Sequence, residues 1–198
     1  MLKIVHRVND PVRLRETPRE LGVEMDLHAF GSRLVAQHDA SRDGPDFDAW
    51  LDAYDHAFAI FNVKEEGIET AVRDRVLAHG IVNFFFLDLS FPALVRMAKS
   101  GERRLAVRVS EYEPVEQALR LSSMVDWVWL DVFSGFPVGK ADVDALKKSG
   151  LKLCLVSPEL HGRETGEIAE MQARIERDGL AIDAVCTKQP RLWQLAGE

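Results

Sequence analysis

The sequence predicts an α/β fold, a compact (β/α)8 TIM barrel formed by a single domain over residues 1–198. Short apolar runs rich in β-branched residues recur along the chain, and segments of helical character separate them. Most of these runs are continuously apolar, which is typical of strands buried on both faces of a parallel sheet. An open, doubly wound sheet is the alternative, but the chain has no G-x-G-x-x-G or Walker A motif to support it.

The apolar runs are predicted to be the eight strands of the barrel. In order, they are Leu2–His6, Val23–Leu27, Ala57–Val63, Asn83–Leu87, Leu105–Val109, Trp127–Val132, Lys152–Val156 and Ala184–Thr187. A further short run, Arg33–Ala36, closely follows the second strand. We expect it to extend the second βα unit and to bring His38 back to the rim formed by the carboxyl ends of the strands.

The segments that follow the third and later strands have the pattern of helices. They are Glu65–His79, Pro92–Ser100, Pro114–Met124, Lys140–Ser149 and Glu164–Gly179. In the first of them, Ile68, Val72, Val76 and Leu77 lie on one face, as in an amphipathic helix. Glycines follow four of the segments, and Pro11, Pro92 and Pro114 lie near helix starts, where helices favour these residues.

The composition is that of a globular protein, with 46% hydrophobic and 29% charged residues and a net charge of −7. The absence of a long basic run argues against a nucleic-acid partner, and no apolar stretch approaches the ~20 residues needed for a membrane span. We expect no secretory signal and a cytoplasmic location, where Cys154 and Cys186 stay reduced and buried. The sequence does not predict the oligomeric state.

Three polar clusters in the first forty residues stand at the ends of apolar runs. They are His6-Arg7, Glu24-Met25-Asp26 and His38-Asp39. Because the carboxyl ends of barrel strands meet at one rim, we expect these clusters to lie together. Two imidazoles and two carboxylates are the groups that a metal-assisted cleavage of a phosphodiester requires.

The two carboxylates of Glu24 and Asp26 are candidates for cation binding. They lie two residues apart on a predicted strand, so both side chains point to the same face. Two close carboxylates repel each other unless a cation or a proton lies between them, and oxygen ligands favour Mg²⁺ or Ca²⁺. A pair of surface carboxylates on an edge strand is the alternative interpretation.

His6 and His38 are candidates for general base and general acid, because imidazole titrates near neutrality. A single histidine after a strand is more often structural, but two histidines flanking a carboxylate pair favour catalysis. Arg7, Lys64 and Arg108 supply positive charge suited to a phosphate. Further polar side chains follow the later strands and are weaker candidates: Asp88, Ser90, Asp131, Ser157, Glu159, His161 and Lys188.

The early motifs resemble those of the glycerophosphodiester phosphodiesterase family, within the phospholipase C-like phosphodiesterases. The corresponding residues are His6-Arg7, Glu16, Glu24-Met25-Asp26, His38-Asp39 and, in the third strand, Ile60-Phe61-Asn62-Val63-Lys64. Lys64 matches the family, whereas Asn62 replaces a metal-ligating glutamate. The small inserted domain of the family is absent, since only residues 39–57 separate His38 from the third strand. Beyond residue 64 the resemblance rests mainly on the alternation of strands and helices.

The resemblance implies a divalent cation, Mg²⁺ or Ca²⁺, as the only cofactor. Glu24 and Asp26 would hold this cation, and Asn62 would offer an amide oxygen as a third ligand. A neutral ligand should bind a cation more weakly than a third carboxylate, because one unit of attractive charge is missing.

The resemblance also implies roles for the basic residues and a class of substrate. His6 and His38 would be the proton-transfer pair, with Arg7 and Lys64 beside the phosphoryl group. A hydroxyl of the substrate would attack phosphorus, and a cyclic phosphate would form. The implied partner is a small phosphodiester, either similar to a glycerophosphodiester or linked to a sugar or nucleotide.

Two other functions stay open on the sequence alone. The substitution at Asn62 is compatible with a catalytically silent barrel that binds a phosphorylated ligand or a partner protein. A different barrel chemistry, such as that of a lyase or aldolase, would use Lys64 or Lys188 as an amine nucleophile.

Overall fold

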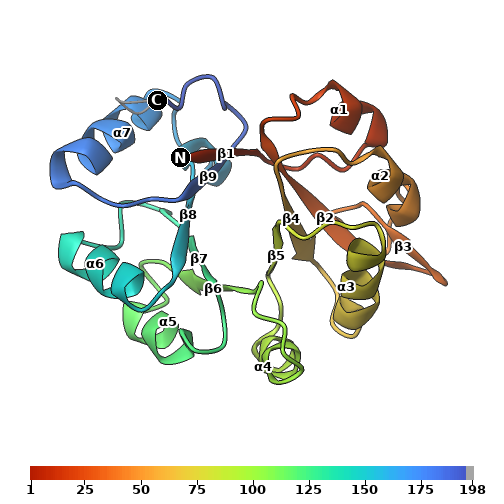
Figure 1. The fold of residues 1–198 in the computed structure, drawn as a ribbon. Coiled ribbons are helices and arrows are strands. Elements are labelled where there is room, and N and C mark those ends of the chain that lie inside the picture. Colours follow the sequence, from red (N-terminus) through yellow and green to blue (C-terminus); the bar gives the residue numbers. More distant parts are fainter. Residues whose placement is uncertain (195–198) are drawn as a thin grey trace. The chain divides into compact units, whose positions relative to one another are not determined.

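The computed structural model describes residues 1–194, in which strands and helices alternate as predicted (Figure 1). The chain divides into two compact units. The N-terminal unit comprises Val5–Leu105, and the C-terminal unit comprises Met1–Ile4 together with Ala106–Glu198.

The N-terminal unit begins with the last residue of the first strand. It contains only Val5 of β1 (Leu2–Val5). Its complete elements are α1 (Pro11–Glu16), β2 (Gly22–Phe30), β3 (Arg33–Val35), α2 (Phe47–Ala53), β4 (Phe58–Val63), α3 (Glu69–Ala78), β5 (Phe84–Leu87) and α4 (Phe91–Lys99). Strands β2, β4 and β5 are parallel neighbours, and β3 pairs antiparallel with the end of β2 as a hairpin. The hairpin accounts for the long second strand, which extends beyond the predicted run to Phe30.

Aromatic side chains fill the core of the N-terminal unit. Phe47 and Trp50 of α2 each pack against Phe61 of β4 in edge-to-face geometry, with ring centroids 5.9 Å apart in both pairs. Phe61 also contacts Phe84 of β5, at 5.5 Å between centroids. The indole N–H of Trp50 donates a hydrogen bond of 2.8 Å to the carbonyl of Val8. Helix α2 therefore fixes the segment that follows β1.

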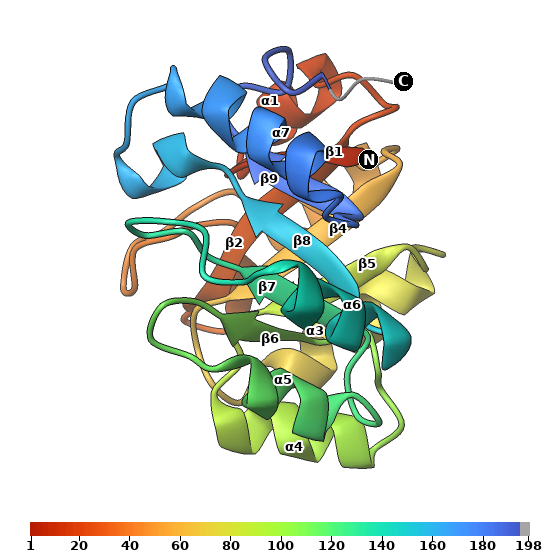
Figure 2. The same ribbon diagram turned by 90° about the vertical axis from the view of Figure 1, so that its left-hand side faces the viewer.

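The C-terminal unit has the same alternation. It contains the first residues of β1. Its complete elements are β6 (Ala106–Val109), α5 (Val115–Leu121), β7 (Trp127–Leu130), α6 (Lys140–Lys148), β8 (Lys152–Val156), the short 3-10 helix η1 (Pro158–His161), α7 (Glu167–Asp178) and β9 (Ala184–Thr187). Strands β6 to β9 pair in parallel, and helices α5, α6 and α7 lie on one side of them (Figure 2). Cys154 and Cys186 are buried in β8 and β9, and neither forms a disulfide among the described residues.

The strand order is that of a (β/α)8 barrel, so the predicted fold class is confirmed. The order is β5-β4-β2-β1-β9-β8-β7-β6, which places the last strand next to the first. Phe86 of β5 also forms a parallel bridge with Leu105, the residue before β6. A doubly wound sheet would instead reverse its strand order at a switch point, and this order contains no such reversal.

Several predicted boundaries are wrong for local reasons. The helix predicted over Glu65–His79 begins only at Glu69, because Gly67 adopts a φ of 102° in the turn before it. Val72 and Val76 are buried as predicted for its apolar face, but Leu77 is 39% exposed. The predicted loop Ser157–Gly162 contains η1. Helix α1 begins at Pro11, where a helix start was predicted, but its bounds were not predicted, and α2 was not predicted. Asp10 and Asp46 cap their first turns with side-chain hydrogen bonds.

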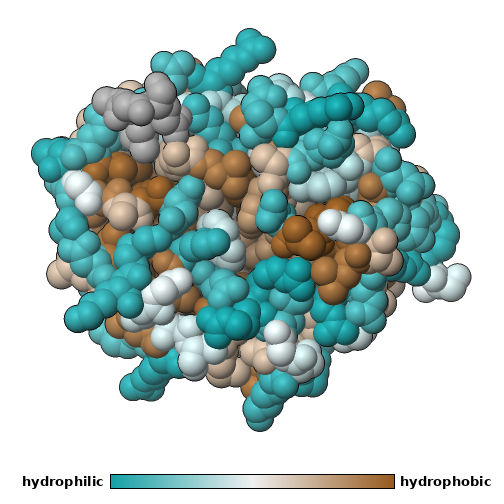
Figure 3. Space-filling view, viewed as in Figure 1, coloured by the Kyte–Doolittle hydropathy of each residue, from teal (hydrophilic) through white to brown (hydrophobic). Residues whose placement is uncertain are grey.

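No helix among residues 1–194 is long and apolar enough to cross a membrane. On the face shown in Figure 3, hydrophobic residues occur in separate patches among mainly hydrophilic ones.

Candidate active site

The centre of the candidate site is the acidic doublet Glu24 and Asp26 on β2. Both side chains are fully buried, and the single residue between them places them on the same face of the strand. Asp26 is the register partner of Asn62 on β4, so the amide of Asn62 lies beside the doublet. The pair is therefore a buried cluster, and the alternative of surface carboxylates on an edge strand is excluded.

Glu24 accepts two hydrogen bonds and lies next to a histidine. Its Oε2 accepts one from the backbone N–H of Arg7 at 2.7 Å, and its Oε1 accepts one from Asn62 Nδ2 at 2.9 Å. The Nε2 atom of His6 lies 3.7 Å from Oε2. Burial and then the charge of Asp26 raise the pKa of Glu24 to about 7, although the two hydrogen bonds and Lys64 oppose this rise.

Asp26 is surrounded by amide and cationic groups. Asn9 contacts it twice: its Oδ1 accepts from the Asp26 backbone N–H at 2.9 Å, and its Nδ2 donates to Oδ2 at 3.2 Å. Arg7 Nε lies 3.2 Å from Oδ2, and Lys64 Nζ lies 3.4 Å from Oδ1. Lys64 also donates a hydrogen bond of 3.1 Å to Asp88, which follows β5.

The backbone at the end of β1 is strained where it meets the doublet. Arg7 has a φ of 56°, in the left-handed region that residues other than glycine seldom adopt. Asp88, the partner of Lys64, has a φ of 58°. Strained residues of this kind cost about 1–3 kcal/mol each and cluster at functional sites, where the surrounding contacts hold them in place.

His38 lies in the loop after β3, and its side chain is 41% exposed. Its Nδ1 pairs with Asp39 Oδ1 at 2.9 Å, and Arg42 contacts the other oxygen of Asp39 at 3.3 Å. The hydrogen bond to His38 and the charge of Arg42 lower the pKa of Asp39, and the charge of Arg7 adds a smaller contribution. Asp39 is thus within electrostatic range of Arg7, although no hydrogen bond or ion pair among residues 1–194 joins His38 to the doublet.

A close backbone approach shapes the loop that carries His38. Gly44 lies against Ala36 and Gln37, where an added Cβ would come within 2.9 Å of the Ala36 carbonyl oxygen and of Gln37 Cβ. The Ala36 backbone N–H donates a hydrogen bond of 2.8 Å to the carbonyl of Pro45. Only glycine fits at position 44, and this residue lets the loop fold back beside β3.

The doublet and Asn62 form an oxygen-rich set that fits a hard divalent cation. Asn62 Oδ1 and Asp26 Oδ1 are buried and accept no hydrogen bond from the described part of the chain, although Asp26 Oδ1 has the Lys64 ammonium 3.4 Å away. Buried oxygens of this kind normally have a partner, and a cation would supply one. The third member is an amide, and accordingly residues 1–194 contain no metal-ligating group of three His, Cys, Asp or Glu side chains.

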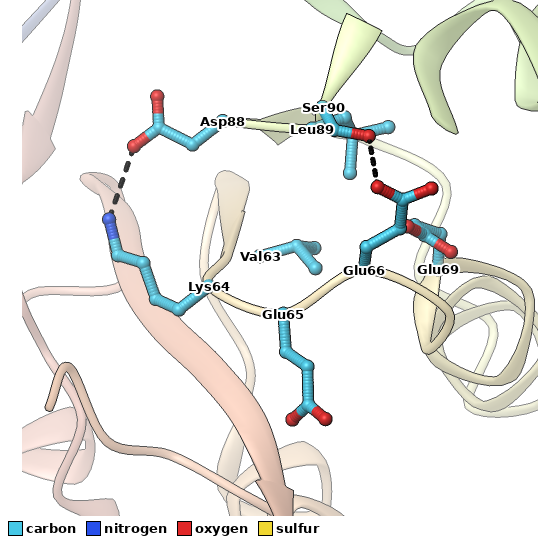
Figure 4. A pocket seen from close by; sticks show the side chains of 8 residues that line it. All are labelled: Val63, Lys64, Glu65, Glu66, Glu69, Asp88, Leu89 and Ser90. Carbon is cyan, nitrogen blue, oxygen red and sulfur yellow. Dashed lines mark hydrogen bonds and ion pairs between the residues drawn. The ribbon is translucent and has the colours of Figure 1, made fainter. Parts of the chain in front are cut away.

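A cavity of about 310 Å³ lies beside Lys64 (Figure 4). The end of β4 and the segment after β5 line it, and Lys64 extends across one end toward Asp88. Glu66 lies opposite, where it accepts hydrogen bonds of 2.7 Å from Ser90 Oγ and from Arg96. The cavity is at the lower end of the size range of small-molecule sites.

Most of the predicted site residues lie in one network of hydrogen bonds and ion pairs. The network also contains one residue that was not predicted from the sequence. His6, Arg7, Glu24, Asp26, Asn62 and Lys64 form one network in the N-terminal unit. The additional residue is Asn9, and no motif in the sequence marks it. Its position three residues after His6 was the only available signal.

The polar residues that follow β6 to β9 belong to the C-terminal unit, whereas Asp88 and Ser90 belong to the N-terminal unit. Arg108 forms an ion pair with the buried Asp131, and His161 Nε2 lies 3.0 Å from the other carboxylate oxygen of Asp131. Glu159 accepts hydrogen bonds from Thr187 Oγ1 at 2.6 Å and from the backbone N–H of Lys188 at 2.9 Å. These residues form two further polar clusters.

Comparison with known proteins supports the fold. No protein-family profile matches the chain, and no curated protein matches it in sequence. Among solved structures, a glycerophosphodiester phosphodiesterase from Agrobacterium tumefaciens has a TM-score of 0.64 at 14% identity, covering 97% of both chains. A glycerophosphoryl diester phosphodiesterase from Parabacteroides distasonis has a TM-score of 0.66 at 14% identity, covering 96% of this chain and 84% of the other.

The same fold also occurs in an enzyme with different chemistry. Tryptophan synthase from M. tuberculosis has a TM-score of 0.57 at 12% identity, covering 96% of this chain and 84% of the other. The chain thus resembles glycerophosphodiester phosphodiesterases in structure over nearly its whole length, and the likeness at this level of identity is one of fold.

Proposed function

We propose that the protein is a phosphodiesterase that cleaves a small phosphodiester with the help of a divalent cation. The observation that carries this proposal is the environment of the buried doublet. Glu24 and Asp26 lie within 4 Å of an imidazole, a guanidinium and an ammonium group, those of His6, Arg7 and Lys64. This combination suits a phosphoryl group, which needs both proton transfer and positive charge.

Glu24, Asp26 and Asn62 would hold the cation, either Mg²⁺ or Ca²⁺. When bound, the cation supplies Lewis-acid stabilisation of the charge on the phosphoryl oxygens. The buried Oδ1 of Asn62, which accepts no hydrogen bond within residues 1–194, supports this assignment. Asn9 supports it indirectly, because its two contacts fix the orientation of the Asp26 carboxylate.

His6 and His38 carry the proton transfers in this proposal. One imidazole takes the proton of an attacking substrate hydroxyl, and the other protonates the leaving oxygen. Asp39 orients His38 through its hydrogen bond to Nδ1. Arg7 binds the phosphoryl oxygens beside the doublet, and Lys64 adds a second positive charge at the edge of the cavity.

The product of this attack is a cyclic phosphate, since the nucleophile belongs to the substrate itself. The new P–O bond forms to the substrate hydroxyl as the bond to the leaving alcohol breaks. The cavity of about 310 Å³ beside Lys64 has room for a small alcohol group. The proposed substrate is therefore a small diester, similar to a glycerophosphodiester or linked to a sugar or nucleotide.

Two measurements on the whole chain test this proposal. Turnover is assayed on glycerophosphodiesters and nucleotide-linked diesters, with Mg²⁺, Ca²⁺ or Mn²⁺ supplied in turn, and with EDTA as the control. We expect release of alcohol that EDTA abolishes. Cation binding is measured separately by titration calorimetry, with Glu24→Gln as the variant that loses binding. Absence of turnover on every substrate with every cation would refute the proposed phosphodiesterase activity.

Substitution of the histidines tests the acid–base roles. We expect His6→Ala and His38→Ala each to lower kcat by about 10²–10⁴-fold, the usual contribution of a positioned acid or base. His56→Ala is the matched control, because His56 contacts Thr17 and lies away from the doublet network. Circular dichroism of each variant checks that the fold is intact. Full activity of His38→Ala would remove His38 from the mechanism.

A catalytically silent barrel is the second candidate, and one observation favours it. Both carboxylate oxygens of Asp26 already contact positive groups of the protein, Arg7 and Lys64, and the third expected ligand is a neutral amide. Such a site would bind a phosphorylated ligand without cleaving it. Binding of a phosphodiester with unchanged ligand after prolonged incubation would support this candidate over the enzyme.

A further inference from the structure

A second polar cluster, in the C-terminal unit, surrounds Asp131. This carboxylate is 1% exposed, and it follows β7. Arg108 of β6 donates to Asp131 Oδ2, and His161 of η1 lies with its Nε2 3.0 Å from Oδ1. The side chains of Arg108 and His161 remain 30% and 15% exposed. One buried carboxylate thus lies against two partly exposed side chains, of which His161 turns its buried Nε2 toward the carboxylate.

Two aromatic rings continue this cluster toward solvent. The ring of Phe133 lies 4.5 Å from that of His161, and Tyr112 lies 5.8 Å from Phe133, measured between centroids. Tyr112 is 80% exposed and Phe133 is 37% exposed. A single exposed aromatic residue needs no explanation, but here two exposed rings and an imidazole adjoin one another beside ionic groups and form an angled platform, with interplanar angles of 51° and 52°.

The loops that present the platform are held rigidly. The Glu111 carboxylate accepts hydrogen bonds from the backbone N–H groups of Phe133, Ser134 and Gly135, at 3.3, 2.7 and 2.9 Å. Ser110 Oγ accepts from the backbone N–H of Tyr112 at 3.0 Å. Exposed rings on preorganised loops lose little entropy when a ligand binds, which is the property of a recognition site.

The charges around the platform favour a neutral ligand. Arg108 lies between two carboxylates: it bonds to Asp131, and its Nε is 3.8 Å from Glu113 Oε1. A phosphate would be repelled by Glu113, and an ammonium group would be repelled by Arg108. The hydroxyl groups of a neutral ring can accept hydrogen bonds from Arg108 and donate them to Glu113. The apolar face of such a ring can stack on the aromatic rings.

We infer that the C-terminal unit carries a binding site for a neutral pyranose ring. Tyr112 and Phe133 would form the stacking surface. Arg108, Glu113 and His161 would hydrogen-bond the hydroxyl groups at the edge of the sugar. All of these residues belong to one unit, and the inference does not depend on phosphodiester cleavage by the doublet site.

Titration of the ¹⁵N-labelled full chain, followed by NMR, tests this inference. The probes are the methyl pyranosides of glucose, galactose and mannose, with inorganic phosphate as the charged comparison. We expect saturable shift changes at residues 110–113, 131–135 and 161 with at least one pyranoside, and none there with phosphate. Binding is read without turnover, so an inactive doublet site would leave the result unaffected.

Removal of the rings distinguishes stacking from other binding. Tyr112→Ala and Phe133→Ala should each weaken binding of the sugar about fivefold, because a stacked ring contributes about 1 kcal/mol. Both side chains are exposed, so these variants should fold. Phe91→Ala is the matched control, since Phe91 is 53% exposed on α4 of the other unit. Three outcomes would overturn the inference: no saturable shift with any pyranoside, sugar binding unchanged in both variants, or phosphate saturating the same residues.

Discussion

Asn9 and Asp26 bind each other twice, through the backbone and the side chain of Asp26. Asn9 Oδ1 accepts from the Asp26 backbone N–H at 2.9 Å, and Asn9 Nδ2 donates to the Asp26 carboxylate at 3.2 Å. The segment after β1 is thereby attached to the centre of β2. This double contact aligns the carboxylate that the proposed cation site requires.

Asn9→Ala should destabilise the protein and misplace Asp26. The substitution leaves a buried backbone N–H without its acceptor, which costs about 1–3 kcal/mol of unfolding free energy. Urea denaturation of the cation-free protein measures this loss. Asn9→Asp retains the acceptor for the backbone N–H but places a charge beside Asp26. If Asn9→Ala unfolds at the same urea concentration as the wild type, the contact contributes nothing.

Glu24→Gln should change how stability depends on pH. Burial and the charge of Asp26 raise the folded-state pKa of Glu24 to about 7, above its unfolded value of 4.5. A raised acid pKa means that the folded state holds its proton more tightly, so unfolding free energy falls as pH rises from about 4.5 to 7. The glutamine variant should not show this loss, which is on the order of 3 kcal/mol.

The measurement for Glu24 is a series of denaturation curves between pH 4.5 and 8, all in EDTA. The unfolding free energy of the variant minus that of the wild type should increase from pH 4.5 to about 7 and then stay constant. A constant difference would show that Glu24 titrates alike in the folded and unfolded chains.

Lys64→Met should move cation affinity and turnover in opposite directions. Lys64 Nζ lies 3.4 Å from Asp26 Oδ1 and 3.1 Å from Asp88. Loss of its positive charge removes a repulsion from the proposed cation site, so Mg²⁺ or Ca²⁺ should bind more tightly in calorimetry. Turnover should fall, because the phosphoryl group loses a cationic partner. Lys64→Arg, which keeps the charge, is the control, and weaker cation binding by Lys64→Met would contradict the assignment.

Glu111→Gln should lower the thermal stability of the protein near neutral pH and should lower it less in acid. Burial alone would raise the pKa of Glu111, but hydrogen bonds from the Ser134 and Gly135 loop lower it to about 2. A lowered acid pKa contributes stability above the unfolded value of 4.5, and this contribution is lost as pH falls toward 2. Thermal unfolding of both proteins at pH 6 and pH 3 measures the effect. An equal deficit at both values would exclude a charge-dependent role.

The sequence predicted the fold well because the strands are buried on both faces. The bounds of β8 and β9 match the predicted runs Lys152–Val156 and Ala184–Thr187, since continuous apolar character marks such strands without ambiguity. Helix α1 has six residues and buries only Leu14, so no periodic pattern marks its extent beyond the predicted helix start near Pro11. Helix α2 was missed although it is as long as the predicted α5 and its buried residues Phe47, Trp50 and Leu51 have helical spacing. Their capping residues, Asp10 and Asp46, were the readable signal.

The candidate site was predictable where it lies on strands and less so where it lies on loops. Glu24, Asp26 and Asn62 occupy β2 and β4, and alternation and register fix which way such residues point. His38 lies on a loop whose path depends on Gly44 and on contacts that no periodicity encodes. Asn9 was missed for the same reason, because its partner is seventeen residues away in the chain.

Arg7 performs two separable tasks with one residue. Its amide serves Glu24, whereas its guanidinium serves Asp26, and the left-handed backbone orients both at once. Glycine at this position would relax the chain and keep the first task while discarding the second. Position 7 therefore links the geometry of the main chain to the electrostatic balance of the doublet, and a side-chain substitution there changes the surroundings of Asp26 while the amide contact to Glu24 stays in place.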